Sequence, residues 1–119
     1  MPMSKRERGQ LRADVLRLLW DGDGPVTANV LLDRFPTGER PALTTLLTVL
    51  SRLESEGLVA REQQGRASVF SVTRPQAEHF AQQMSQVLGA SGDRSAVLQQ
   101  FAGALSEHDL AVLRAALGD

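Results

Sequence analysis

The sequence lacks cysteine and tyrosine, contains one tryptophan, and has no long run of apolar residues. Without cysteine the chain has no disulfide, no thiolate metal ligand and no thiol redox switch. No apolar stretch approaches the roughly 20 residues of a membrane-spanning helix, and the N-terminus lacks the apolar core of a signal peptide. We therefore expect a cytoplasmic protein without a membrane-inserted segment.

Motifs for catalysis and for cofactor binding are also missing. The chain has no glycine-rich phosphate loop and no nucleophile motif. Its two histidines, His79 and His108, have no carboxylate or cysteine partner at ligand spacing, so we expect both to be solvated rather than to bind a metal. The sequence predicts neither an enzyme nor a cofactor site.

The charge of the chain is nearly balanced, at −1. Through Arg74 the sequence has eleven basic and nine acidic residues, and from Pro75 onward it has two basic and five acidic residues. Such a sum says little, because a local patch matters more for binding nucleic acid. Lys5, Arg6 and Arg8 form one short basic cluster, which is either a solvated tail or an arm that contacts DNA.

The most informative pattern lies between Ala42 and Leu58. At about 100° per residue this stretch forms a helix with one apolar side and one side of short hydroxyls. The apolar side consists of Leu43, Leu46, Val49, Leu50 and Leu53. The outer side consists of Thr44, Thr48, Ser51 and Ser55, with Thr45 and Arg52 beside them. Solvated faces usually carry Glu, Lys and Gln, so short hydroxyls indicate close approach to the major groove of DNA or to another helix.

The residues after this helix favour the DNA interpretation. Gly57 stands where a left-handed helix cap is expected. Residues 58–62 read as a strand, residues 63–66 as a turn, and residues 67–72 as a second strand with Phe70 and Val72 on one face. A three-turn helix, a glycine stop and a hairpin with a basic turn predict the recognition helix and wing of a winged helix-turn-helix domain.

Two helices and a link precede the recognition helix. The first is predicted over residues 9–20, with an apolar stripe of Leu11, Val15, Leu18 and Leu19. Pro25 and Val26 read as a short extended link, and Thr27 as the N-cap of a second helix that ends at Arg34 or Phe35. We expect Val30, Leu31 and Phe35 to point inward. The amides of residues 27–29 either hold a DNA phosphate or are simply capped.

Three short amphipathic helices are predicted after Pro75. Their apolar stripes are Ala77, Phe80, Ala81, Met84, Val87 and Leu88; Val97, Leu98, Phe101 and Leu105; and Leu110, Leu113 and Leu117. Ser106 to Asp109 resembles a capping box. These helices bury little alone, so they fold back on the winged domain or pair with a second copy. Pairing is favoured because a helix-turn-helix protein usually needs two heads to read a dyad.

The predicted fold class is therefore mainly α with a small β wing. A winged helix-turn-helix domain is expected over residues 1–74 and a helical dimerisation region over residues 75–119. The predicted DNA-binding residues are Thr44, Thr45, Thr48, Ser51, Arg52 and Arg66. The predicted dimerisation residues are Phe80, Met84, Leu98, Phe101, Leu110, Leu113 and Leu117. For Arg52, an ion pair with Glu56 four residues later is the purely structural alternative.

These residues also carry a family resemblance. Ala42, Thr44, Thr45, Thr48, Val49, Leu50, Arg52, Leu53, Gly57 and Leu58 follow the pattern A-aromatic-T-T, T-V-L, R-L and G-L. The sequence resembles the penicillinase-repressor family, the BlaI/MecI/CopY group of winged-helix repressors, although Leu43 replaces the usual aromatic residue. The end of the first helix, Leu19-Trp20, and the wing at Gly65-Arg66 also fit.

The resemblance implies a homodimeric repressor that binds DNA dyads with TACA/TGTA-like half-sites. For some members it implies release by a membrane sensor metalloprotease that cuts the dimerisation arm before a Phe. Gln100-Phe101 is the nearest match to that cleavage site. Copper-responsive members carry paired cysteines near the C-terminus, and the absence of cysteine excludes that branch.

Two other functions stay open from the sequence. A winged helix can bind another protein, and such a version is expected to expose apolar anchors beside Thr44, Thr48, Ser51 and Arg52. Leu47, at the flank of that face, is the residue that argues for it. A ligand-sensing regulator with a pocket between arm and head is the second alternative. The low aromatic content, 4%, disfavours a roomy pocket for a planar ligand.

Overall fold

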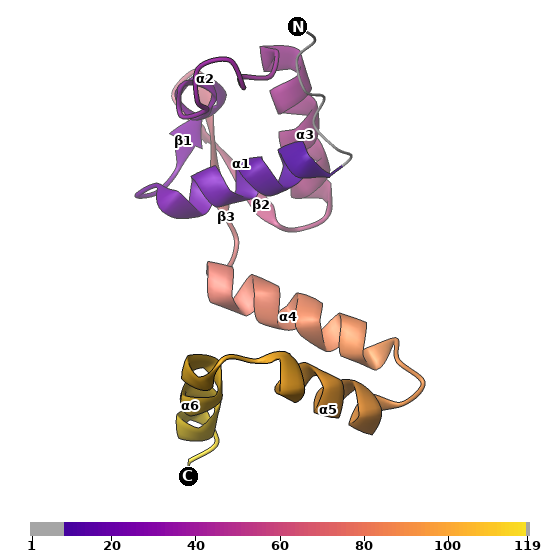
Figure 1. Ribbon diagram of the computed structural model, residues 1–119. Helices are drawn as coiled ribbons and strands as arrows, with labels where there is room; N and C mark the ends of the chain where they lie inside the picture. The colour runs from indigo at the N-terminus through magenta and orange to yellow at the C-terminus, as the bar shows by residue number, and fades with distance from the viewer. Residues whose placement is uncertain (1–8, 119) are drawn as a thin grey trace, which may run out of the picture. The chain divides into compact units, whose positions relative to one another are not determined.

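The computed structural model describes residues 9–118. Its elements are α1 (Gln10–Asp21), β1 (Val26–Thr27), α2 (Ala28–Asp33), α3 (Leu43–Ser55), β2 (Val59–Gln64), β3 (Ala67–Val72), α4 (Gln76–Gly89), α5 (Arg94–Ala104) and α6 (Glu107–Ala116). The chain divides into two compact units, and the boundary in the sequence lies between Gln76 and Ala77. The first unit holds α1 to α3 and all three strands, and the second holds the last three helices (Figure 1).

The three strands form one antiparallel sheet with the order β1-β3-β2. Val26 pairs with Phe70 and Thr27 pairs with Val69, so the segment predicted as a short extended link is a strand. That prediction was incomplete because this two-residue strand forms only through pairing with β3, which lies more than 40 positions later in the sequence. β3 is the central strand, and this position explains why both Val69 and Phe70 are buried.

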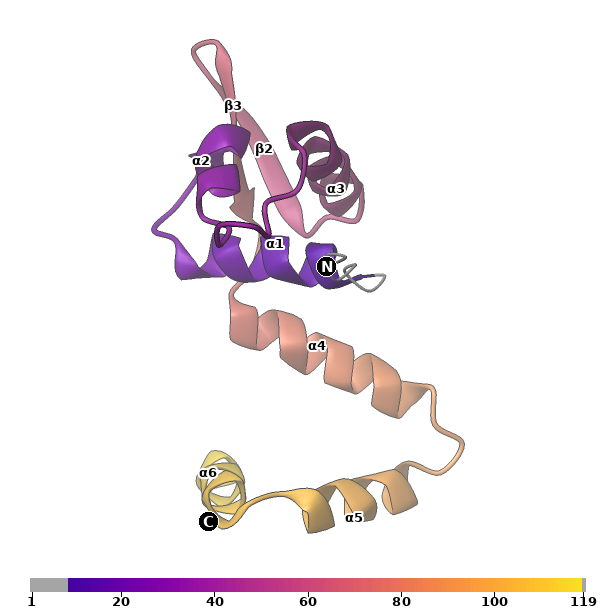
Figure 2. The ribbon, with the colours of Figure 1, turned by 45° about the horizontal axis from the view of Figure 1, so that its top comes forward.

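The hairpin between β2 and β3 is longer and tighter than predicted. Gln64 pairs with Ala67, which leaves Gly65 and Arg66 as a two-residue turn in place of the expected four-residue turn. Gly65 has φ of 61°, and the following residue has a negative φ. This arrangement matches a type II′ turn, in which glycine takes the first central position and the strands continue with their natural twist. Figure 2 shows the hairpin projecting beyond the helices of the first unit.

Local capping signals are confirmed at several helix ends. Thr27 accepts a hydrogen bond from the amide of Val30 at 3.2 Å, and Ser106 accepts one from the amide of Asp109 at 3.1 Å. Gly57 follows α3 with φ of 81°, the left-handed conformation that favours glycine. α2 ends at Asp33, slightly earlier than predicted, with Arg34 as its C-cap.

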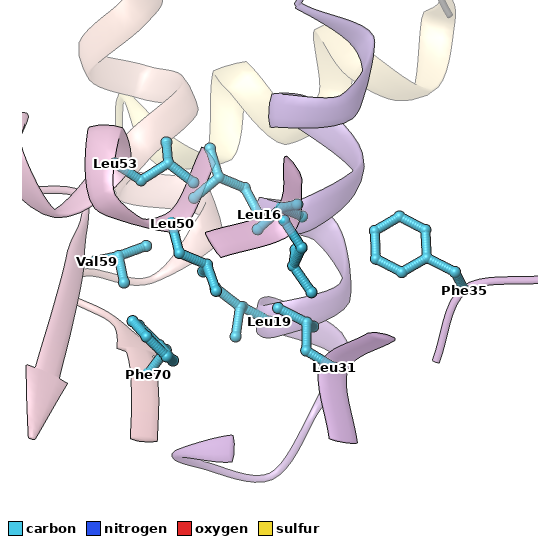
Figure 3. Close-up of a cluster of buried hydrophobic side chains, with 10 residues drawn as sticks. Leu16, Leu19, Leu31, Phe35, Leu50, Leu53, Val59 and Phe70 are labelled. Atoms are coloured by element: carbon cyan, nitrogen blue, oxygen red, sulfur yellow. The ribbon is translucent and has the colours of Figure 1, made fainter. Parts of the chain in front are cut away.

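The core of the first unit lies between α1, α2, α3 and the sheet (Figure 3). Its buried members are Val15, Leu16, Leu19, Leu31, Phe35, Leu46, Leu50, Leu53, Val59 and Phe70. The apolar stripe of α3 therefore reaches this core, as predicted. Full burial of a leucine contributes about 1.5–3 kcal/mol, so this cluster is the main source of stability for the unit.

Three positions of the apolar pattern differ from the prediction. Leu43 is exposed, because it is the first residue of α3 and lies one turn before Leu46 reaches the core. Val30 is also exposed, because the neighbouring Leu31 takes the buried side of the short α2. Leu16 is buried although the predicted stripe left it out. α1 packs against α2, α3 and β3, so it buries a wider face than a single stripe.

A second set of contacts joins the ends of elements in the first unit. The indole Nε1 of Trp20 donates a hydrogen bond to the carbonyl of Arg74 at 3.0 Å. The hydroxyl of Thr73 donates to the carbonyl of Gly57 at 2.8 Å. These bonds fix the base of the hairpin to the end of α1 and to the end of α3. They leave the turn of the hairpin free to project.

In the second unit, α5 doubles back along α4 in both views (Figures 1 and 2). Asp93 caps α5 by accepting a bond from the amide of Ala96 at 3.1 Å. His79 of α4 is 6% exposed, and its ring meets that of Phe80 edge-on at 5.3 Å. The expectation of a solvated His79 was wrong, since helical spacing alone does not show which polar residue is covered. His108 is exposed, as expected.

No helix among residues 9–118 is long and apolar enough to cross a membrane. The same residues contain no group of three or more histidine, cysteine, aspartate and glutamate side chains placed to hold a metal ion.

Candidate nucleic-acid interface

The outer face of α3 carries the residues predicted to bind DNA. Thr44, Thr45, Thr48, Ser51 and Arg52 are all exposed. A shallow depression of about 330 Å³ runs along this face and is lined by Leu47, Thr48, Ser51, Arg52 and Ser55. The structure thus brings three of the predicted residues into one surface with Leu47, while Thr44 and Thr45 lie at the start of the same helix.

The N-terminus of α3 has no side-chain cap. Ala42 is its N-cap residue and makes no capping hydrogen bond through its side chain, whereas Thr27, Asp93 and Ser106 cap other helices. The first amides of α3 therefore have no side-chain acceptor among residues 9–118. Thr44 and Thr45 lie in this first turn, where the helix dipole favours a negative charge.

Two hydroxyls on the outer face are bonded to the backbone of their own helix. Thr48 Oγ1 donates to the carbonyl of Thr44 at 3.0 Å, and Ser55 Oγ donates to the carbonyl of Ser51 at 3.1 Å. A hydroxyl has only one proton to donate. Toward solvent, Thr48 and Ser55 therefore present oxygen lone pairs and carbon, and not a donor.

Arg52 makes no ion pair with any of residues 9–118, and the alternative in which it pairs with Glu56 is wrong. Glu56 pairs with Arg12 of α1. The two guanidinium nitrogens Nη1 and Nη2 of Arg12 donate to the two carboxylate oxygens, both at 2.6 Å. The guanidinium of Arg52 is left available on the exposed face.

The Arg12–Glu56 pair links the start of α1 to the C-terminal end of α3. The hydrogen bonds from Arg12, together with its charge, hold the pKa of Glu56 below its usual range, although slight desolvation acts the other way. Nothing in the sequence marked Arg12 as part of the site, because its partner lies 44 positions away. The contact connects the start of α1 to the end of α3, the helix that carries the predicted DNA-binding residues.

The wing contributes a second cation. Arg66 lies in the exposed two-residue turn of the hairpin and makes no ion pair with residues 9–118. Arg61 differs, since it lies 4.0 Å from Glu54 and 5.4 Å above the ring of Phe70. Arg17 and Arg40 are likewise paired with carboxylates, at 3.4 Å each. The basic cluster at residues 5, 6 and 8 lies outside the described residues.

The second unit exposes an apolar face. A groove of about 580 Å³ between α4 and α5 is lined mainly by the apolar residues Phe80, Met84, Val87, Leu88, Val97, Leu98 and Phe101. Most of the residues predicted to dimerise are exposed: Phe80, Met84, Leu98, Phe101, Leu113 and Leu117. Leu110 is half-buried. Val87 and Val97 also line the groove, and their helical spacing already marked them as part of the same stripes.

The predicted cleavage site, Gln100-Phe101, lies inside α5 and not in a loop. Both residues are exposed, and α5 has no buried residue.

The structure resembles several solved proteins at low sequence identity. The PcaV regulator from Streptomyces coelicolor, solved with its natural ligand, is 22% identical with a TM-score of 0.44, and the match covers 90% of this chain and 70% of that chain. A mutant of ZitR from Lactococcus lactis is 14% identical with a TM-score of 0.48 (98% and 77% covered). FabT from Streptococcus pneumoniae, solved in complex with DNA, is 17% identical with a TM-score of 0.43 (88% and 68% covered).

Comparison with curated proteins finds no match. The family comparison is decisive, because residues 8–119 match the family model described as penicillinase repressor. That match spans the winged unit and the helical unit together. The exposed hydroxyl face of α3 and the basic turn of the hairpin agree with it. The chain belongs to the penicillinase repressor family, and its fold is that of a winged-helix, DNA-binding transcriptional repressor.

Proposed function

We propose that the protein is a homodimeric repressor that binds a dyad operator, with α3 of each subunit in a major groove and each wing along the flanking backbone. The outer face of α3 carries this proposal. It combines short hydroxyls with Arg52, which has no ion pair among residues 9–118, and the family match supports DNA as the partner of that face. Arg52 and the hydroxyls of Thr44, Thr45 and Ser51 supply the hydrogen bonds to bases and phosphates.

Arg66 is proposed to contact the phosphate backbone. It lies at the tip of a projecting hairpin and has no carboxylate partner among the described residues. A guanidinium in such a position contributes affinity without reading sequence. The uncapped amides at the start of α3 support a second phosphate contact, because helix N-termini favour anions.

The second unit is proposed to join two subunits. Its α4–α5 groove is lined almost wholly by apolar side chains, and six of the seven predicted dimerisation residues are exposed. Leaving such a face in water is unfavourable, and large exposed apolar patches mark interaction sites. Two copies that cover each other's faces place two heads on one operator. The half-sites are expected to be TACA/TGTA-like and to be separated by one or more helical turns.

Release from the operator is proposed to follow cleavage of the dimerisation region by a membrane sensor metalloprotease. Gln100-Phe101 is the proposed site. Because it lies inside α5, cutting there requires that the helix open first. α5 buries no side chain in a single subunit, which makes its opening less costly than that of α3. A single head then keeps only half of the DNA contacts.

The test is a selection of duplexes from a randomised library by the full-length protein, followed by competition binding at physiological salt. The expected result is an inverted repeat that binds at least a hundredfold more tightly than random duplex. Retention of all library sequences to the same extent would contradict sequence-specific binding. A selected motif without two-fold symmetry would contradict the dimeric part of the proposal.

A further inference from the structure

Leu47 occupies an unusual place on the outer face of α3. It is 36% exposed, although it is a large apolar residue, and it lines the same depression as Thr48, Ser51 and Arg52. The other leucines in the middle of the helix, Leu46 and Leu50, are completely buried. Leu47 is not a member of the core cluster, and its exposed apolar surface lines the depression.

Thr48, beside Leu47, presents carbon and lone pairs to the same depression. Its hydroxyl proton is used in the bond to the carbonyl of Thr44 at 3.0 Å. Because the Cβ atom is tetrahedral, turning the hydroxyl toward that carbonyl turns the methyl group away from it. The middle of the outer face of α3 is thus less polar than its many hydroxyl residues indicate.

In the major groove, the C5-methyl of thymine is the apolar group of the base edges, and phosphates offer no such group. We propose that Leu47, together with the methyl group of Thr48, makes the protein select thymine by contact with this methyl. The proposal rests on the proposed function, since it requires α3 to lie in the major groove. The same geometry leaves the oxygen of Thr48 to accept a bond from the amino group of adenine or cytosine.

The experiment uses the duplex selected from the randomised library and full-length protein. Each thymidine of the duplex is replaced in turn by 2′-deoxyuridine, which removes only the methyl group, and the Kd is measured by fluorescence anisotropy. Burial of one methyl group is worth about a fourfold change in affinity. At one or two positions per half-site we expect such a loss, and about a sixteenfold loss when the same position is changed in both half-sites.

Matched variants connect the effect to the two residues. Leu47→Ala is expected to bind the thymidine and deoxyuridine duplexes equally at the position that Leu47 contacts. Thr48→Ser keeps the hydroxyl and removes the methyl, so it should lose discrimination at its own position. Thr48→Val keeps a methyl at that place and should retain discrimination between the two bases. Thermal unfolding of each variant verifies that the fold is intact.

Each outcome has a distinct meaning. Specific binding to the selected duplex with equal affinity for thymidine and deoxyuridine overturns the inference and leaves the proposed function standing. A deoxyuridine effect that persists unchanged in Leu47→Ala and Thr48→Ser also overturns it, because the methyl then acts through DNA shape. Absence of any preferred sequence overturns the proposed function itself.

Discussion

At the scale of single residues, one ion pair connects α1 to α3, the helix proposed to bind DNA. The guanidinium nitrogens of Arg12 donate hydrogen bonds to both carboxylate oxygens of Glu56 at 2.6 Å, and this pair joins α1 to the end of α3. Exposed pairs usually contribute only about 0.2–1 kcal/mol, and both partners here are partly exposed. The contribution to stability is therefore small, and the structural consequence is a link between α1 and the C-terminal end of α3.

The first prediction concerns this pair and pH. The pKa of Glu56 is lowered in the folded state from an ordinary value of 4.5, so its stabilisation is complete above that value. It is lost as the pH falls through the lowered pKa of the folded state. Glu56→Gln should reduce the free energy of unfolding by about 0.5 kcal/mol near pH 7. Urea unfolding should show the difference disappearing in acid.

Glu54→Gln is the matched control, because Glu54 lies 4.0 Å from Arg61 and has a looser contact. Its effect should be smaller at neutral pH. A gap between wild type and Glu56→Gln that is equally large in strong acid would show that the carboxylate charge is not the cause.

At the scale of elements, α3 has two faces with different tasks. Leu46, Leu50 and Leu53 are completely buried, while Leu47 and Thr48 face outward. The buried core residues and the proposed recognition surface thus lie on different faces of one helix. A substitution on one face should change one property and spare the other.

The second prediction tests this separation. Leu50→Ala should lower the free energy of unfolding by about 2–5 kcal/mol, because it removes a fully buried side chain and leaves a cavity. Leu47→Ala on the same helix should change it by less than about 1 kcal/mol. Urea unfolding of both variants measures the difference. Equal losses would mean that Leu47 contributes to the core.

The third prediction concerns the wing. Arg66→Ala should weaken binding to selected and random duplexes alike and should reduce the slope of log K against log salt by about one unit. Arg17→Ala is the control, since Arg17 is paired with Asp14 on α1. Titrations at several salt concentrations give the slope. An unchanged slope in Arg66→Ala, or a loss restricted to the selected sequence, would contradict a phosphate contact.

At the scale of the whole molecule, the first unit can fold around its own core, whereas the second leaves most of its apolar residues exposed. In the proposed dimer, affinity for DNA depends on joining two winged units, because a tethered second unit binds at an effective concentration of order mM. Through Arg74 the sequence has eleven basic and nine acidic residues, so we expect linkage to contribute more than electrostatic attraction.

The fourth prediction tests this linkage. Phe101→Asp places a carboxylate in the proposed subunit interface, at a cost of several kcal/mol. Sedimentation equilibrium should show monomers, and operator affinity should fall sharply while the winged unit stays folded. Gln99→Asp on the exposed surface of the same helix is the control and should stay dimeric. A dimeric Phe101→Asp that still holds the operator would show that this face does not join the subunits.

The sequence by itself determined the features that depend on near neighbours. The stripe of Leu46, Leu50 and Leu53, the glycine stop at Gly57 and the caps at Thr27 and Ser106 all follow from contacts within about four residues. Helical period and cap chemistry are local, so they can be read in order along the chain. The same local patterns carry the resemblance to the repressor family.

Only the tertiary structure decided the features that need a distant partner. β1 exists because Val26 pairs with Phe70, and Glu56 binds Arg12 of α1 in place of Arg52 on its own helix. Leu43 is exposed because the core ends before the first turn of α3, and the helical period of the sequence does not show where the core ends. These contacts join residues that are far apart in the chain. Local chemistry allows several partners for each of them, and only the packing of the folded chain decides which partner is in reach.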